Sequence, residues 1–300
     1  MKLLSVTPAP HIWAKDDTQA IMRDVLIALA PAFFASIVIF GVPALLVTVV
    51  CVAAAVLSEF IFEKAVKRPV TIRDLSAVVT GVLLSFCLPY DIPLWIAALG
   101  SVIAIVVVKQ LFGGIGQNFA NPAITARVVL LICGFNGAMT TFNLDGVSSA
   151  TPLADGAANP GFMTMFLGNH AGSLGETCAL ALLIGGMYLL VRKVISWHIP
   201  VAYIGTVAVI SLIANLDLSV QLMGGGLLLG AFFMATDYTT SPMTNVGKLI
   251  YGVGCGLLTM MVRLWGATPE GVSYAILLMN ILTPHIDKLT KHKAFGGEKA

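Results

Sequence analysis

The chain has 300 residues and a formal net charge of +2; 58% of its residues are hydrophobic and only 11% are charged. Soluble domains carry roughly 25% charged residues, so this composition, with a mean hydropathy of +0.93, excludes a soluble globular protein and predicts an integral membrane protein. The basic residues lie at the ends of apolar runs rather than in one patch, and we therefore expect no nucleic-acid partner.

Ten apolar runs follow a polar N-terminal arm. Each run is long enough, or nearly so, to cross a hydrocarbon core of about 30 Å as a helix that rises about 1.5 Å per residue. We therefore expect an all-α membrane protein with about ten transmembrane helices. The expected spans are residues 22–40, 43–62, 75–89, 93–109, 121–135, 174–192, 198–214, 219–235, 246–265 and 271–286. The third and eighth are short for a full crossing.

Lys and Arg are unevenly distributed between the two sides of these runs. They precede the first run, separate the second from the third, follow the sixth and end the chain, whereas none occurs between Val128 and Val191. Since cytoplasmic loops carry the excess of Lys and Arg, we expect both termini to be cytoplasmic and the loop of residues 136–173 to face outward. Arg263 is the one exception.

An internal repeat explains Arg263. Residues 100–109 resemble residues 254–263, at an offset of about 154 residues. Because each half holds five runs, an odd number, the second half must be inverted relative to the first. Arg263 is then the outer counterpart of the inner Lys109. Inverted repeats with short segments interrupted by Pro or Gly mark a binding site between the two halves.

These observations divide the chain into five regions. They are a cytoplasmic N-terminal arm (1–21), a first five-helix repeat (22–135), an outer loop (136–173), a second five-helix repeat (174–287) and a cytoplasmic tail (288–300). The outer loop is rich in hydroxyl groups and free of Lys and Arg, and loops of this length are usually functional or disordered. This favours a site in the loop; the alternative is a surface loop of ordinary Ser, Thr and Pro turns.

Two polar clusters, residues 113–122 and 236–244, lie on the expected cytoplasmic side. Asn118 and Asn121 in the first cluster and Asp237 in the second supply donors and acceptors that can satisfy a flavin or a similar polar heterocycle. The alternative is that these segments are turns whose side chains cap the following helices.

The chain has few features of a stand-alone enzyme or pump. Ionisable groups in or near the runs are expected at span ends, and these are Glu59, Glu63, Lys109, Arg127, Glu176, Asp237, Arg263 and Asp287. A pump usually needs a charged group at depth. No P-loop, Gly-x-Gly-x-x-Gly opening a soluble helix or Ser–His–Asp set is present, and the five scattered cysteines lack metal-ligand spacing.

A motif in the outer loop resembles the acceptor site of membrane flavoproteins that carry FMN through a phosphoester bond to a threonine. The motif is Asp145-Gly146-Val147-Ser148-Ser149-Ala150-Thr151. The usual form is Asp-x-x-Ser/Thr-Gly-Ala-Thr, so a serine stands here where glycine is common. Residues 118–123, 172–176 and 235–237 resemble further signatures of the same family. The resemblance covers nearly the whole chain and is to the RnfD component of the Rnf ion-translocating ferredoxin:NAD oxidoreductases, which is related to the NqrB component of the sodium-translocating NADH:quinone reductases (the RnfD/NqrB family).

The resemblance implies a flavoprotein subunit that passes electrons through covalent FMN and couples them to Na⁺ or H⁺ translocation within a larger complex. Thr151 would carry the FMN phosphate, while the proline that follows holds the chain extended at this residue. Asp145 and Ser148, with the small residues Ser149 and Ala150, would be recognised by an FMN transferase. The chain is not expected to be catalytic alone.

The same resemblance implies a second, non-covalent flavin, riboflavin or FMN, between Asn118, Asn121 and Asp237. Asp287 resembles an acidic position connected with ion uptake, although solvation of a carboxylate at a helix end explains it equally well. The expected partners are other subunits of the complex, the transferase and membrane lipid. The expected location is the bacterial cytoplasmic (inner) membrane.

Two other classes of function stay open. A solute channel or transporter also suits a five-plus-five inverted repeat, but it needs a pore lined by polar, aromatic or His side chains at depth. All five His residues lie at the ends of the expected spans, in loops or in the terminal arms. A structural anchor protein predicts no bound flavin at all.

Overall fold

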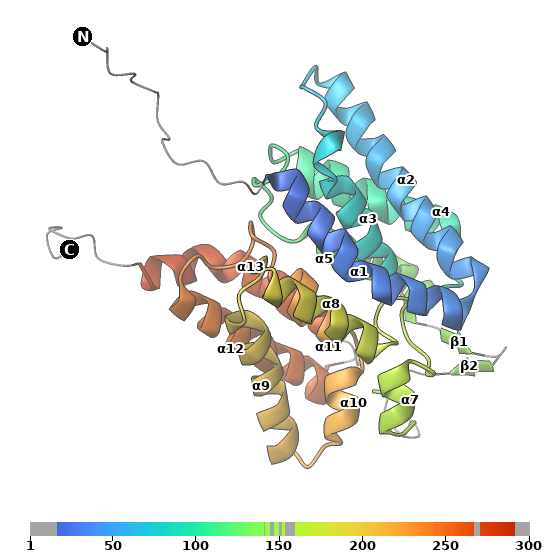
Figure 1. Cartoon of the computed structure of the whole chain (residues 1–300), viewed down its shortest axis with the longest axis vertical. Coiled ribbons are helices and arrows are strands. Elements are labelled where there is room, and N and C mark those ends of the chain that lie inside the picture. The colour runs from blue at the N-terminus through green and yellow to red at the C-terminus, as the bar shows by residue number, and fades with distance from the viewer. Residues whose placement is uncertain are drawn as a thin grey trace, which may run out of the picture.

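The computed structural model describes residues 17–140, 142–144, 147–149, 152–153, 160–266 and 271–291. Within these ranges the chain is helical except for loops, turns and one short hairpin. Figure 1 shows the blue to green helices of the first half at the upper right and the yellow to red helices of the second half at the lower left. The prediction of an all-α membrane protein is confirmed.

The first half begins at an N-cap, where the Asp17 side chain accepts a hydrogen bond of 2.7 Å from the Thr18 N–H. Pro122 occupies the first turn of α5, where its missing N–H costs nothing. The elements are α1 (Thr18–Phe40), α2 (Val42–Ala65), the 3₁₀ turn η1 (Ile72–Asp74), α3 (Ser76–Phe86), α4 (Leu94–Val102) with its π-helical continuation η2 (Ile103–Gln110), and α5 (Pro122–Leu130), which continues through η3 (Leu131–Phe135) into α6 (Asn136–Thr140).

A two-stranded antiparallel hairpin, β1 (Phe142–Leu144) and β2 (Val147–Ser149), lies in the loop between the halves. In the described part of the chain the elements after the hairpin are helical. They are α7 (Phe162–Leu167) in the same loop and, in the second half, α8 (Ala179–Val191), α9 (His198–Ile213), α10 (Leu218–Met223), α11 (Leu227–Leu229) with its π-helical continuation η4 (Gly230–Met234), α12 (Asn245–Trp265) and α13 (Val272–Leu289).

Four helical stretches of the described chain are long and apolar enough to cross a membrane: α1, α2, Pro122–Thr140 and α12. Apolar side chains such as Phe34 (65% exposed) and Val38 (85% exposed) on α1 face outward, as expected for contact with lipid. The remaining helices are shorter, and α3 and α8 have only 11 and 13 residues. The total of ten spans therefore stays a prediction.

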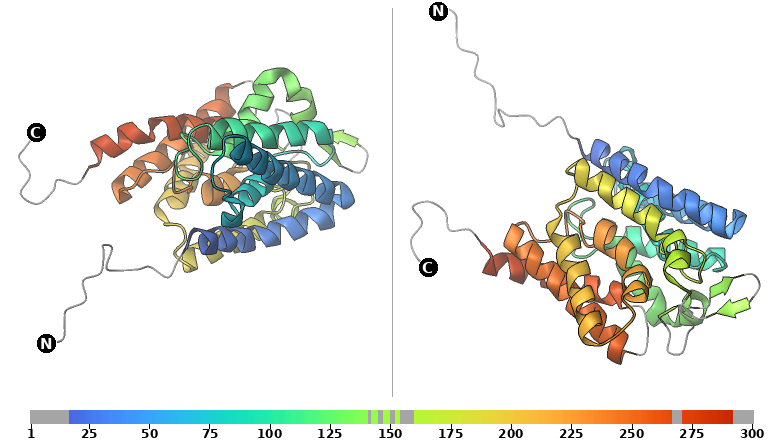
Figure 2. Two further views of the ribbon diagram at one scale, coloured as in Figure 1. Left: turned by 90° about the horizontal axis from the view of Figure 1, so that it is seen from above. Right: turned by 60° about the horizontal axis from the view of Figure 1, so that its bottom comes forward.

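Equivalent helices of the two halves pack against each other. At the repeat offset α8 corresponds to α1 and α13 to α5, and the structure packs α1 on α8 and α5 on α13. In the right-hand view of Figure 2 the yellow α8 lies directly alongside the blue α1. The Asp24 carboxylate near the start of α1 accepts from Arg192 after the end of α8, at 2.9 and 3.2 Å, so the two helices are antiparallel. A pseudo-two-fold axis between the halves brings a helix against its own counterpart in this way.

Close backbone contact holds the α1–α8 pair together. A side-chain carbon at Gly185 of α8 would lie 2.0 Å from the Ala28 carbonyl oxygen of α1. Only glycine fits there, and small residues that let helix backbones approach are typical of membrane helix interfaces. The seam between the two halves is consequently tightly packed.

Candidate functional site

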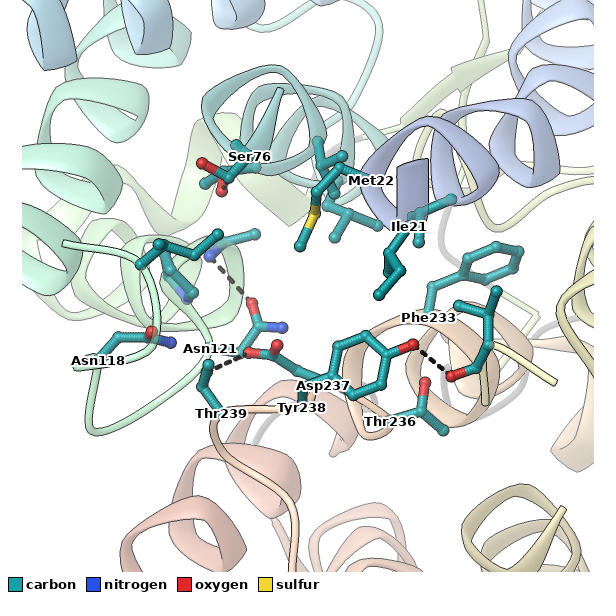
Figure 3. Close-up of a pocket in the computed structure, with 18 of the residues that line it drawn as sticks. Ile21, Met22, Ser76, Asn118, Asn121, Phe233, Thr236, Asp237, Tyr238 and Thr239 are labelled. Carbon is teal, nitrogen blue, oxygen red and sulfur yellow. Dashed lines mark hydrogen bonds between the residues drawn. The ribbon is translucent and has the colours of Figure 1, made fainter. Parts of the chain in front are cut away.

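A cavity of about 360 Å³ opens between the two halves. It is bounded by the start of α1, the starts of α3 and α5, the end of η2, the end of α8, and η4 with the segment that follows it. All of these are the ends expected on the cytoplasmic side. Figure 3 shows Asn118, Asn121, Asp237 and Thr239 grouped on one side of this cavity, with Met22, Ile21 and Phe233 across it. We call it the interface cavity.

Three residues of the two polar clusters predicted from the sequence line the interface cavity. Asn118, Asn121 and Asp237 all line it, although Asp237 is more than a hundred positions from the two asparagines. Most of the remaining lining is apolar and includes Val79, Leu83, Phe232 and Phe233. Small-molecule sites typically combine such walls with a few polar groups in roughly 300–1,000 Å³.

Asn121 has a structural task in this cavity. Its Oδ1 accepts from the N–H groups of Ala123 and Ile124 at 3.1 and 3.4 Å, which caps α5, and its Nδ2 donates to the Met234 carbonyl at 3.3 Å. The capping alternative is therefore confirmed for this residue. Because Met234 ends η4, the Asn121 side chain also ties the two halves together, and one N–H of its carboxamide is left for a ligand.

Asp237 is the acidic group of the interface cavity. Its exposed surface faces the cavity, while protein surrounds its other sides, and this burial raises the pKa of its carboxyl group. Hydrogen bonds from the hydroxyls of Thr239 and Thr240 to Oδ2, at 3.1 and 3.3 Å, and from Asn118 act in the opposite direction. Asp237 can thus present either a proton donor or an acceptor to a bound group.

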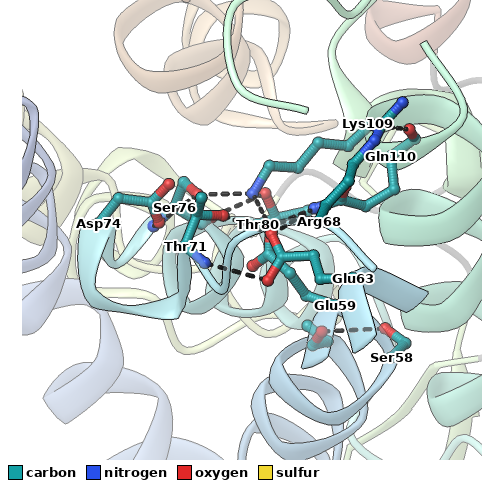
Figure 4. Close-up of polar contacts among 11 residues, drawn as sticks. Ser58, Glu59, Glu63, Arg68, Thr71, Asp74, Ser76, Thr80, Lys109 and Gln110 are labelled. Atoms are coloured by element: carbon teal, nitrogen blue, oxygen red, sulfur yellow. Dashed lines mark hydrogen bonds and ion pairs between the residues drawn. The ribbon is translucent and has the colours of Figure 1, made fainter. Parts of the chain in front are cut away.

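A buried polar network lies beside the interface cavity and reaches it through Lys109 and Ser76. The Lys109 Nζ donates to Glu59 Oε1 and to Ser76 Oγ, both at 2.6 Å, and the Gln110 Nε2 donates to Glu59 at 2.7 Å and to Glu63 at 3.3 Å. Figure 4 shows these side chains converging from separate helices. Glu59 is 0% exposed and Lys109 3%, so the network is a buried ion pair that holds α2, α3 and η2 in register.

Sequence reasoning placed these groups at span ends but did not pair them. Because Glu59 and Glu63 are four positions apart, the sequence predicts that they share one face of α2, but it does not identify the residues that they contact. Arg127 is 5% exposed, and its Nη1 lies 3.4 Å from the Ser273 hydroxyl at the start of α13. It therefore connects α5 of the first half with α13 of the second.

The acceptor motif lies only partly within the described residues. Asp145, Ala150 and Thr151 fall outside them, while Ser148 and Ser149 belong to β2. The strand register pairs Phe142 with Ser149 and Leu144 with Val147. Asp-Gly between paired strands is the sequence typical of a two-residue hairpin connection. The hairpin was not expected from the polar composition of this loop.

Leu153, the second residue after Thr151, contacts the second half. A side-chain carbon at Gly225 would meet the Leu153 Cδ1 at 2.4 Å, so Leu153 packs directly on the glycines that separate α10 from α11. The chain two residues beyond Thr151 is therefore anchored to the membrane helices.

Asp287 is separate from the interface cavity. On α13, its Oδ1 accepts from the Met243 N–H at 3.0 Å. It thereby caps the loop that leads into α12. Among the described residues, no group of three or more His, Cys, Asp or Glu side chains is arranged to hold a metal ion.

Comparison with known proteins extends this description. Residues 5–296 match the NQR2, RnfD, RnfE family. The chain is 48% identical to the D component of the Na⁺-translocating ferredoxin:NAD⁺ oxidoreductase complex of Acetobacterium woodii, across 99% of this chain and 96% of the relative. It is 42% identical to the proton-translocating counterpart of Clostridium ljungdahlii, across 98% and 96%. It is 38% identical to the D component of the ion-translocating oxidoreductase complex of Stutzerimonas stutzeri, across 94% and 93%. These matches extend over nearly the full length of every chain compared, and the chain therefore belongs to the NQR2, RnfD, RnfE family of membrane proteins.

Proposed function

We propose that this chain is the RnfD component of an ion-translocating ferredoxin:NAD oxidoreductase complex of the Rnf type and that it carries FMN covalently on Thr151. The observation that carries the proposal is the acceptor run ending in Thr151, in a chain whose relatives are named as D components of such complexes. The relatives' names include both Na⁺ and protons as the translocated ion. The partners are then the other subunits, an FMN transferase and the lipid of the bacterial cytoplasmic membrane, with both termini in the cytoplasm.

The chain contributes position rather than redox chemistry. When bound, FMN would supply one-electron transfer. The Thr151 hydroxyl is the proposed attachment point for the FMN phosphate, and a proline at position 152 disfavours a helical conformation of the residue before it. Strand β2 ends at Ser149, and Leu153 packs against Gly225. The proposed attachment point is therefore two residues from a side chain that contacts the second half.

We further propose that the interface cavity holds a non-covalent flavin, riboflavin or FMN. The cavity has the polar groups that such a ring needs, because the carboxamides of Asn118 and Asn121 and the carboxyl group of Asp237 all line it. Val79, Leu83, Phe232 and Phe233 supply the apolar surface for the faces of a flat ring system. A cofactor between inverted halves fits the general placement of sites in such folds.

Covalent attachment is tested by replacing Thr151 with Ala. The purified chain is separated by denaturing electrophoresis, illuminated with ultraviolet light, and its labelled peptide is mapped by mass spectrometry. We expect fluorescence in the wild type and none in Thr151→Ala, whereas Thr151→Ser retains part of it because the hydroxyl survives. Thr140→Ala is the matched control: Thr140 is an exposed threonine in the same loop whose hydroxyl donates to the Asn136 carbonyl, and its loss is expected to leave the label intact.

The fluorescence gel also separates this proposal from the two alternatives, since neither a channel nor a structural anchor binds flavin covalently. A Thr151→Ala protein that still fluoresces after denaturation, with the label on another residue, would show that the acceptor is misassigned. Loss of the label should leave the amount of inserted protein unchanged, because removal of a loop hydroxyl usually changes stability by less than about 0.5 kcal/mol.

The non-covalent flavin is tested by counting flavin that solvent extraction releases. Asn121→Leu is expected to reduce it, but this variant also removes the cap of α5. Asn118→Leu is the sharper variant, because the Asn118 Nδ2 donates only to the nearby Ala120 carbonyl (3.1 Å) and to Asp237. Both variants should lower extractable flavin and keep the covalent label. Unchanged flavin in Asn118→Leu, Asn121→Leu and Asp237→Asn alike would remove this part of the proposal.

A further inference from the structure

Three interruptions of helical structure meet near the end of α1 that is expected to face outward. Helix α3 stops at Phe86; residues 172–178 precede α8 without helical structure; and residues 224–226 separate α10 from α11. The Leu174 N–H donates to the Leu88 carbonyl and the Gly175 N–H to the Phe86 carbonyl, both at 3.0 Å. We call residues 86–88, 172–178 and 224–226 together the outer junction.

The outer junction contains a buried carboxylate. Glu176 is 4% exposed, and its Oε1 accepts from the Ser173 N–H at 2.9 Å. Among the described residues, nothing forms an ion pair with it. In contrast, the buried carboxylates of Asp24 and Glu59 are paired with Arg192 and Lys109. A buried carboxylate is costly unless it is paired, protonated or bound to a cation.

Two hydroxyl groups beside this carboxylate also lack partners. Ser173 is 0% exposed and Thr177 1%, and neither Ser173 Oγ nor Thr177 Oγ1 has a hydrogen-bond partner in the described part of the chain. A side-chain carbon at Gly172 would meet Glu176 Oε1 at 3.1 Å and Thr177 Cγ2 at 3.3 Å, so the Glu176 carboxylate and the Thr177 methyl group both border Gly172. Buried polar groups without partners are rare in native structures and point to a missing ligand or water.

The second half of the chain closes the outer junction from the other side. A side-chain carbon at Gly226 would lie 2.9 Å from Glu176 Oε2, so the backbone at Gly226 borders the carboxylate, and its φ of +69° favours glycine at this position. In the part of the chain that the structure describes, no ion pair joins the carboxylate to Arg263. Arg263 donates to the carbonyls of Gln221 and Gly224 and to the Gln221 side chain, at 2.6–3.0 Å.

We propose that Glu176, with the hydroxyl groups of Ser173 and Thr177, forms a binding site for a small cation, sodium or a proton, at the outer junction. Carboxylate, hydroxyl and carbonyl oxygens are the ligands that hard cations prefer, and broken helical segments are where membrane transporters bind ions. Arg263, which lies beside Gly225, weakens the attraction for a positive ion. Weak binding suits an ion that must leave again.

The cation site is close to the segment that bears the acceptor threonine. Leu153, two residues after Thr151, packs on Gly224 and Gly225, and the next residue, Gly226, borders Glu176. A cation at Glu176 is therefore near the segment to which, under the proposed function, a redox group is attached. In a protein interior, a nearby positive charge favours the arrival of an electron. This link to electron transfer rests on the proposed function, whereas the cation site itself does not.

Cation binding is measured on the purified full chain, without other subunits or flavin. Its apparent Tm is recorded by intrinsic fluorescence in detergent, while NaCl replaces choline chloride at constant ionic strength. A sodium site gives a saturable rise of Tm with NaCl, because a ligand that binds only the folded state stabilises it. Glu176→Gln, which keeps an acceptor for the Ser173 N–H, should abolish the rise. Thr177→Val keeps the shape of the side chain and should raise the half-maximal sodium concentration about tenfold. Asp24→Asn is the matched control and should retain the wild-type sodium response.

A proton site is detected in a second arm by pH-difference infrared spectra. It gives no sodium response, but a titrating C=O band of a protonated carboxyl group that Glu176→Gln lacks. Either a sodium response or a titrating band that depends on Glu176 supports the proposal. A sodium response that persists in Glu176→Gln, or the absence of both signals in the wild type, overturns it. Each readout is independent of Thr151, so failure of the covalent-flavin proposal leaves this test intact.

Discussion

Replacing Lys109 with Met tests whether the buried network beside the interface cavity stabilises the first half as an ion pair. Lys109 and Glu59 are 2.6 Å apart and essentially inaccessible to solvent. In Lys109→Met the Glu59 carboxylate keeps only the Gln110 Nε2 as a donor, and its Oε2 already lacks a partner among the described residues. Removing one partner of a buried pair costs about 3–5 kcal/mol, because the other charge is left uncompensated.

The double variant separates the ion pair from simple packing. Glu59→Gln alone leaves the Lys109 ammonium with Ser76 as its partner. The double variant, Glu59→Gln with Lys109→Met, removes both charges. Replacing a whole buried pair by uncharged residues often changes stability little. We therefore expect the double variant to be more stable than the sum of the single variants predicts, by about 2 kcal/mol or more. Unfolding is followed by far-ultraviolet circular dichroism as the mole fraction of SDS in mixed micelles rises.

A matched control for Lys109 is Lys64, on the helix that carries Glu59. Lys64 lies near the end of α2 but is exposed, with its Nζ 5.6 Å from the centroid of the Phe60 ring. Lys64→Met should cost less than about 1 kcal/mol. If the two single variants and the double variant are additive within about 0.5 kcal/mol, Lys109 and Glu59 do not interact as a pair, and the structural reasoning is refuted.

Three further predictions follow from the site and the topology. A cysteine at Asn159 should react with an impermeant maleimide in intact cells and one at Glu298 should not; the reverse labelling would invert the proposed orientation. If Asp287 takes part in ion uptake, Asp287→Asn should change the ion dependence of turnover of the complex, whereas an unchanged dependence would leave the observed capping of the Met243 N–H as its role. The raised pKa of Asp237 means that, between its unfolded pKa of about 3.9 and its folded pKa, the native state binds more protons than the unfolded state. Its contribution to stability is therefore greatest at low pH and is lost as pH rises through that interval. The apparent Tm of Asp237→Asn relative to the wild type should accordingly increase with pH and level off above the folded pKa; a constant difference would contradict this.

Much of the candidate site could be predicted because its polar residues interrupt apolar runs. Asn118, Asn121 and Asp237 lie where two runs end, and an inverted repeat brings such ends to a common interface. The short third and eighth runs were also informative. The structure shows why they are short: α3 ends at Phe86, and α10 is separated from α11 by residues 224–226. Polar residues and glycines that interrupt an apolar run can be located from the sequence alone.

Which side chains meet across the interface could not be predicted in the same way. Hydropathy determines roughly where a helix enters the membrane, but the direction in which each side chain points around the helix axis is decided by packing against other helices. Lys109 finds Glu59 on a helix some fifty positions earlier in the chain, and Arg127 reaches Ser273 on the opposite repeat. Neither pairing leaves a local pattern. The burial of Glu176 has the same origin, because the backbone at Gly226 borders the carboxylate only in the folded chain. In a membrane protein, apolar residues face both the lipid and the core. The sequence therefore shows roughly where a charged residue lies along a span, but only the fold identifies its partner.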